Sequence, residues 1–269
     1  MYRELAEKIG EIDLLMITFD SLRFDVAERA WREGKTSFLR QLLPAGWEAR
    51  HTPGSFTYAA HAAFFAGFFP TPAAPGIHAR PFSLQFPPRR GEKLGAVRLE
   101  GSTLMEGLRA QGYHTLCIGG VGFFSELNPL GSVFPRLFDE SHWEPAFGVS
   151  EPASARRQIE CACKRLDHMS GDKPVFLFLN LSAMHSPTYH YLQEATEDSI
   201  DSQQAALEYV DRQLPPLFEA LQARGRGGWA FLMSDHGTTF GEDGYFGHRL
   251  ARPAVWQVPY GECRWEGRG

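Results

Sequence analysis

Short apolar runs rich in branched and aromatic residues alternate along the chain with longer stretches whose apolar residues recur at helical spacing. The runs predict buried strands, over residues 12–19, 113–118, 175–181 and 229–233. The stretches predict helices, over residues 21–34, 103–110, 153–166 and 203–224. A helix-then-strand unit that repeats in this way is typical of a parallel sheet covered by helices. We therefore expect an α/β fold in a single domain spanning residues 1–269.

Composition and charge exclude several classes of function. The 269 residues are 43% hydrophobic, which is enough to bury a sizeable core. The net charge is -5 and no basic block is interleaved with aromatic residues, so we expect no nucleic-acid partner. The apolar runs are shorter than the roughly 20 residues of a membrane helix, so no membrane span is expected. Residues 1–11 lack the apolar segment of a secretory signal, which favours a cytoplasmic location.

Polar side chains follow three of the four predicted strands. Asp20 follows the first strand, and His185 follows the third. The fourth strand is followed by Ser234-Asp235-His236-Gly237 and then by Gly247-His248. Ligands of open parallel sheets gather at the carboxyl ends of the strands. Carboxylate oxygens combined with imidazole nitrogens suit zinc or manganese, whereas magnesium prefers oxygen ligands alone. The pattern therefore predicts a divalent metal site at this edge of the sheet.

Each of these residues also has a purely structural interpretation. Asp20 could cap the helix expected after it, and the Asp235-His236 pair could form an ordinary turn with the glycine that follows. Single histidines such as His185 and His248 are often surface side chains. Independent caps and turns have no reason to converge on one sheet edge, so the joint pattern favours the metal site.

A further candidate lies in the segment Ser55–His61, which leads into an apolar stretch and predicts a buried helix starting just after Thr57. As a helix cap, Thr57 or Ser55 would have only a structural role. The same position faces free amides and the positive end of the helix dipole, where a phosphate group is favoured. A hydroxyl that also contacts a metal there is a usable nucleophile near neutral pH. Spacing alone leaves both interpretations open, and it allows His61, one turn further on, either to orient Thr57 or to be a core histidine.

Together these residues resemble the alkaline phosphatase superfamily, in its sulfatase-like and phosphodiesterase-like branch. The resemblance covers nearly the entire chain and is carried by Phe19-Asp-Ser-Leu-Arg, Thr57-x-x-x-His-x-x-x-x-x-Gly67, the His-x-Pro at His185, Tyr209-Val-Asp-Arg-Gln, and Ser234-Asp-His-Gly with Gly247-His248. It implies a three-layer core with a mostly parallel central sheet flanked by helices. It also implies a divalent metal held by Asp20, Thr57, Asp235 and His236. His185 and His248 match the two histidines that phosphoethanolamine transferases of this superfamily place on the substrate phosphate.

Several departures from the family pattern narrow the expected activity. Sulfatases need a Cys or Ser nucleophile with Pro and Arg two and four residues on, where this chain has Ala59 and His61, so sulfate ester hydrolysis is not expected. Two-zinc phosphodiesterases carry an Asp where this chain has Leu181, so one metal ion is expected rather than two. Ser21 replaces the second acid of the sulfatase-type Asp-Asp pair. Because the chain stops shortly after a late core strand over 255–260, we expect the carboxyl-terminal subdomain of larger relatives to be missing.

The resemblance and the residues lead to one expected function. We expect a metal-dependent hydrolase of a small phosphate or phosphonate ester, with Thr57 forming a phosphothreonine and with His185 and His248 holding the phosphate oxygens. Two alternatives stay open: a phosphoryl-group transferase of the phosphoethanolamine type, and an inactive member that only binds a metal or a partner. Substrate specificity is expected to lie in residues 70–101 and 119–143. The substrate itself and the oligomeric state do not follow from the sequence.

Overall fold

The computed structural model describes residues 2–66, 103–169 and 171–268. The segment 70–101, where we expected determinants of substrate specificity, lies outside the described residues.

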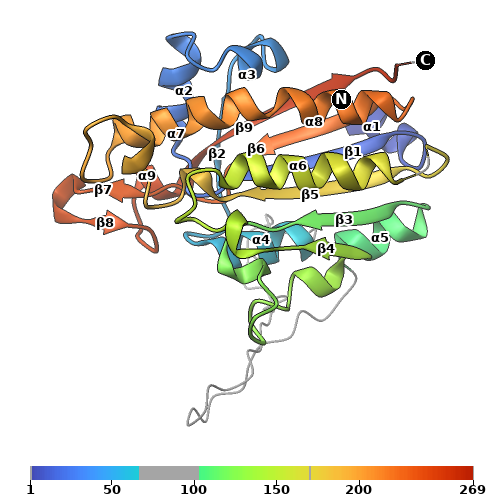
Figure 1. Cartoon of the computed structure of the whole chain (residues 1–269), viewed down its shortest axis with the longest axis horizontal. Coiled ribbons are helices and arrows are strands. Elements are labelled where there is room, and N and C mark those ends of the chain that lie inside the picture. Colours follow the sequence, from blue (N-terminus) through green and yellow to red (C-terminus); the bar gives the residue numbers. More distant parts are fainter. Residues whose placement is uncertain (1, 67–102, 170, 269) are drawn as a thin grey trace, which may run out of the picture.

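Within these ranges the central sheet has seven strands, in the order β2-β9-β6-β1-β5-β3-β4 (Figure 1). The strands are β1 (Asp13–Phe19), β2 (Glu48–His51), β3 (His114–Ile118), β4 (Glu140–His142), β5 (Val175–Leu181), β6 (Gly228–Met233) and β9 (Gln257–Trp265). β1 pairs in parallel with β5 and β6, and β3 pairs in parallel with β5 and β4. β9 pairs in antiparallel with β6 on one side and with β2 on the other. The four predicted strands are confirmed and form the parallel centre of the sheet.

Helices cover both faces of this sheet (Figure 1). The helices are α1 (Tyr2–Lys8), α2 (Phe24–Arg32), α3 (Ser37–Leu42), α4 (Thr57–Ala66), α5 (Leu104–Ala110), α6 (Ser154–Asp167), α7 (Ile200–Gln213), α8 (Pro215–Ala223) and α9 (Pro253–Trp256). A short hairpin, β7 (Thr239–Phe240) and β8 (Phe246–Gly247), stands apart from the main sheet. Short 3-10 helices occupy residues 122–124, 135–137, 145–147, 182–184, 189–191 and 242–244.

Alternation along β1 shows how the three layers form. Leu15 and Ile17 belong to one hydrophobic cluster, which contains buried residues of α2, α6, α7 and α8. Leu14 and Met16 point to the other face and belong to a second cluster, which contains buried residues of α4 and α5. Successive side chains of a strand point to opposite faces, so a strand that is apolar throughout must be buried on both sides. The three-layer α/β architecture predicted from the sequence is therefore confirmed.

The structure corrects three predicted boundaries. The helix predicted over 21–34 begins at Phe24, because Ser21 has a φ of 66°, which is incompatible with a right-handed helix. The helix predicted over 203–224 is two helices, since Pro215 lacks the N–H of a helix interior and starts α8. The late strand predicted over 255–260 is displaced: α9 ends at Trp256 and β9 follows.

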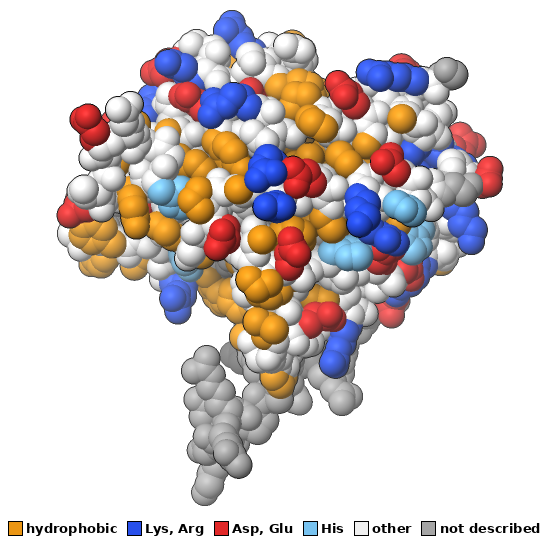
Figure 2. Space-filling model, in the orientation of Figure 1, with side chains coloured by type: hydrophobic (Ala, Val, Ile, Leu, Met, Phe, Trp, Pro, Cys, Tyr) orange, Lys and Arg blue, Asp and Glu red, His pale blue; other side chains and the backbone are white. Residues whose placement is uncertain are grey.

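The surface of the described residues carries charges of both signs. On the face shown in Figure 2, Lys and Arg side chains are interspersed with Asp and Glu side chains. Within the described ranges, none of the helices has both the length and the apolar character that crossing a membrane requires.

Candidate metal centre

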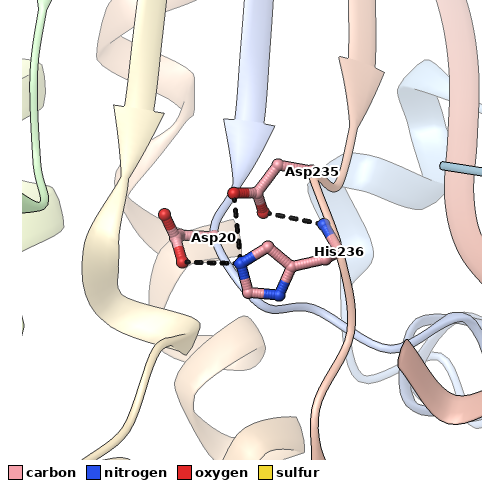
Figure 3. Close-up of side chains that lie close together, drawn as sticks. All are labelled: Asp20, Asp235 and His236. Carbon is pink, nitrogen blue, oxygen red and sulfur yellow. Dashed lines mark hydrogen bonds and ion pairs between the residues drawn. The ribbon is translucent and has the colours of Figure 1, made fainter. Parts of the chain in front are cut away.

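Three candidate ligands meet at the carboxyl ends of two neighbouring strands. Asp20 directly follows β1, and Asp235 and His236 come just after β6 (Figure 3). Because β1 and β6 pair in parallel, residues more than 200 positions apart in the sequence end at the same place. One ligand atom from each side chain lies within 4.8 Å of the others, and all three side chains are buried. The structure thus brings together three of the four residues predicted to hold the metal.

The two carboxylates of this site lack a counter-charge within the described part of the chain. No Lys or Arg there forms an ion pair with Asp20 or Asp235. Oδ2 of Asp235 is buried without a hydrogen-bond partner, which is costly for a charged oxygen. Burial and the nearby Asp20 carboxylate raise the pKa of Asp235 well above its usual range. A divalent cation would supply both the missing partner and the missing charge.

The ring of His236 is oriented toward the two carboxylates. Its Nδ1 donates to the carbonyl of Gly237 at 2.9 Å, which leaves the lone pair of Nε2 facing the carboxylates. Nε2 lies 3.5 Å from Oδ2 of Asp235 and 4.0 Å from Oδ1 of Asp20. Burial lowers the pKa of His236, so the ring is held in the neutral form that binds metals. Mixed oxygen and nitrogen donors fit zinc or manganese.

Thr57 is the first residue of α4 rather than the residue that caps it. Its side chain is buried, and its Oγ1 lies 3.4 Å from Oδ2 of Asp20 and 3.2 Å from Nε2 of His236. The hydroxyl is therefore next to two of the three candidate ligands, which is the position the sequence interpretation required of a nucleophile.

His185 and His248 line a pocket together with Thr57. The pocket has a volume of about 340 Å³, and its other wall is formed by Val121, Gly122, Phe123, Asn128, Leu130, Gly131 and Val149. The rings of His185 and His248 are 5.7 Å apart, and that of His248 is 4.6 Å from that of His236. Nδ1 of His185 donates to the carbonyl of Ser186 at 2.7 Å, which leaves Nε2 free for another contact. The wall contains residues of the segment 119–143, where we expected specificity determinants.

Asn180 was not identified from the sequence, although it contacts the site. Its Nδ2 donates to Oδ2 of Asp20 at 3.0 Å, and its Oδ1 accepts from the backbone N–H of Val121 at 3.1 Å. It therefore links a candidate metal ligand to the pocket wall. The available signal was a single amide in the otherwise apolar and fully buried strand β5.

His61 is a hydrogen-bonded core histidine. Its Nδ1 donates to the carbonyl of Thr57 at 2.8 Å, and its Nε2 accepts from the hydroxyl of Thr18 at 3.1 Å. Aromatic rings of Phe65, Phe124 and Phe178 surround it. Burial lowers its pKa from 6.5 to about 4.

The low pKa of His61 predicts a loss of stability in mild acid. Because the unfolded chain takes up this proton near pH 6.5 and the folded chain only near pH 4, stability is lost as the pH falls between these values. Between pH 6.5 and pH 5, His61 should lower the free energy of unfolding by about 2 kcal/mol. Denaturant unfolding of metal-free His61→Gln should show a pH dependence that is smaller by about this amount. The same substitution at His168, which is exposed, serves as the control; equal pH profiles for both variants would contradict the prediction.

Comparison with solved structures identifies the same fold in several proteins. The C-terminal periplasmic domain of phosphoethanolamine transferase EptC from Campylobacter jejuni has a TM-score of 0.63 at 15% identity, over 94% of this chain and 79% of that one. The corresponding EptC domain from Escherichia coli, in a complex with zinc, has a TM-score of 0.61 at 14% identity, over 96% of this chain and 73% of that one. The lipoteichoic acid synthase LtaP from Listeria monocytogenes has a TM-score of 0.60 at 13% identity, over 96% of this chain and 66% of that one.

Comparison with the curated proteins found no match. The model of the sulfatase family matches residues 13–260, a range that contains every candidate ligand and both pocket histidines. Members of this superfamily are typically hydrolases or transferases of phosphate or sulfate esters. With nearly the whole chain matched and the fold shared with solved members of the superfamily, this protein belongs to the sulfatase family.

Proposed function

We propose that this protein is a metal-dependent hydrolase of a small phosphate or phosphonate ester. The observation that carries the proposal is the position of the Thr57 hydroxyl, which contacts Asp20 and His236 and also lines the pocket of His185 and His248. We propose that one zinc or manganese ion is held by Asp20, Asp235, His236 and Thr57. When bound, such a cation lowers the pKa of a neighbouring hydroxyl and offsets negative charge.

Thr57, His185 and His248 have different roles in the proposed reaction. Thr57 first releases its hydroxyl proton to solvent; its alkoxide oxygen then attacks phosphorus, the bond to the leaving oxygen breaks, and Thr57 carries the phosphoryl group. His185 and His248 hold the non-bridging oxygens, and one of them donates a proton to the leaving oxygen. Water then attacks the phosphothreonine and gives one proton to that histidine, the bond between phosphorus and the Thr57 oxygen breaks, and Thr57 leaves as the alkoxide, ready for another turnover.

The proposal is tested with chelator-treated protein assayed on aryl phosphate monoesters, aryl phosphate diesters and aryl phosphonate esters. We expect no turnover without metal, turnover of at least one substrate after zinc or manganese is added, and no hydrolysis of aryl sulfates. Turnover unaffected by chelation would contradict the metal dependence. Complete inactivity on all of these esters with metal bound would instead favour the inactive metal-binding alternative.

Hydrolysis and transfer are separated by their products. The same reactions are run with and without an added alcohol or amine, and the fate of the phosphoryl group is followed by phosphorus NMR. Hydrolysis predicts that the product of attack by water accumulates at the same rate in both. This product is inorganic phosphate from a monoester, a phosphate monoester from a diester, and a free phosphonate from a phosphonate ester. Release only in the presence of the acceptor, with the group on that acceptor, would identify a transferase.

A further inference from the structure

The turn that follows Asp20 has an uncommon backbone conformation. Ser21 has a φ of 66°, which non-glycine residues rarely adopt, and it is buried. In this conformation its N–H donates to Oδ1 of Asp235 at 3.1 Å, while its hydroxyl donates to Oδ1 of Asp20 at 3.0 Å. One residue therefore orients both candidate metal-binding carboxylates. A strained conformation of this kind persists only where surrounding contacts hold it.

Gln203, in the first turn of α7, supplies such contacts. Its side chain is fully buried, and its Nε2 donates to the carbonyl of Ser21 at 2.8 Å and to the carbonyl of Met184 at 3.1 Å. Its Oε1 accepts from the backbone N–H of Arg23 at 3.3 Å. Met184 immediately precedes His185. A single amide thus bonds to the backbone of the turn after β1 and to that of the loop after β5.

The backbone at the start of α7 is held by hydrogen bonds, so the position of Gln203 is fixed. Ser199 and Ser202 form a reciprocal capping box at the N-terminus of this helix. The N–H of Gln203 donates to the carbonyl of Ser199 at 3.0 Å. The side-chain amide of Gln203 therefore extends from a fixed backbone. Both of its N–H bonds and its oxygen have backbone partners, and these hydrogen bonds hold the partner segments in place.

We propose that Gln203 is a positioning residue, which holds the Ser21 turn and the His185 loop in the arrangement that metal and phosphate binding require. The inference rests on the proposed function for its metal and concerns the geometry of the same site. Groups that orient metal ligands commonly change metal affinity about 10- to 100-fold when removed. A residue that only fills the core would lower stability without changing the metal affinity of the folded protein.

The adjacent residue offers a matched control. Gln204 lies on the same helix turn and is also largely buried, but its amide bonds to the side chains of Arg29, Glu33 and Glu208, away from the site. The variants to compare are Gln203→Met, which removes all three bonds, Gln203→Glu, which removes both donors at nearly constant shape, and Gln204→Met. Each is measured for zinc affinity by competition with a chromophoric chelator, well below its melting temperature.

We expect both Gln203 variants to bind zinc about 10- to 100-fold more weakly than wild type. Gln204→Met should stay within about twofold, because Gln204 does not contact the backbone of the site. A Gln203 variant that melts at lower temperature but keeps wild-type zinc affinity would overturn the inference.

A second measurement keeps the inference independent of the proposed function. Hydrogen exchange of metal-free protein should be faster in residues 20–23 and 183–185 of Gln203→Met than in the same residues of Gln204→Met. If wild type binds neither zinc nor manganese, the proposed function fails, and this comparison alone decides whether Gln203 holds the two loops. Equal exchange in the two variants would then overturn the positioning role.

Discussion

Thr57→Ala should lose about 10⁴-fold or more in turnover of phosphate esters while it still binds metal, because the hydroxyl that attacks phosphorus is gone and Asp20, Asp235 and His236 remain. The hydroxyl contacts both Asp20 and His236, so a somewhat weaker metal affinity is expected as well. The measurements are single-turnover and steady-state rates with an aryl phosphate ester, together with the metal content of the dialysed protein.

Thr57→Ser provides the matched control, since it retains the hydroxyl at the same position of α4 and removes only a methyl group. It should keep measurable turnover and form a phosphoserine that mass spectrometry can trap at low pH. If Thr57→Ala turned over substrate at the wild-type rate, Thr57 would not be the nucleophile, and the proposed reaction would have to start from water.

Asp235→Asn should abolish metal binding and with it the stabilisation that metal gives. At a metal concentration of 100 times Kd, bound metal raises the free energy of unfolding of the wild type by about 2.7 kcal/mol, and it should not raise that of the variant. The metal-free variant should be at least as stable as metal-free wild type at pH 7, because the substitution removes one of two neighbouring buried carboxylates. Elemental analysis and thermal unfolding with and without zinc check both parts.

Asp201→Asn is the control for Asp235→Asn. The Asp201 side chain is 70% exposed and pairs with Arg29 on the surface, so its loss should change neither metal content nor the stabilisation by zinc. Full metal content in Asp235→Asn would show that this carboxylate is not a ligand, and the proposed centre would lose its best-supported oxygen donor.

The sequence by itself determined four parallel strands at the centre of the sheet and the candidate chemistry. Strands β1 and β5 are apolar at nearly every position, and such runs are readable because a strand between two helical layers must be buried on both faces. The residues after these strands stand out because the rest of the strand is apolar. The apolar stretch after Thr57 likewise predicted α4, although with a start one residue later than the structure shows.

The tertiary structure alone decided how these residues meet. The order of strands places β1 between β5 and β6, and this order results from packing across the whole sheet, which no local pattern encodes. The left-handed turn at Ser21 likewise depends on contacts with Asp235 and Gln203, about 200 residues away in the chain. The helix propensity of the local sequence favours a helix that includes Ser21. Buried hydrogen bonds to distant segments contribute more free energy than the propensity of one residue, so the turn forms instead.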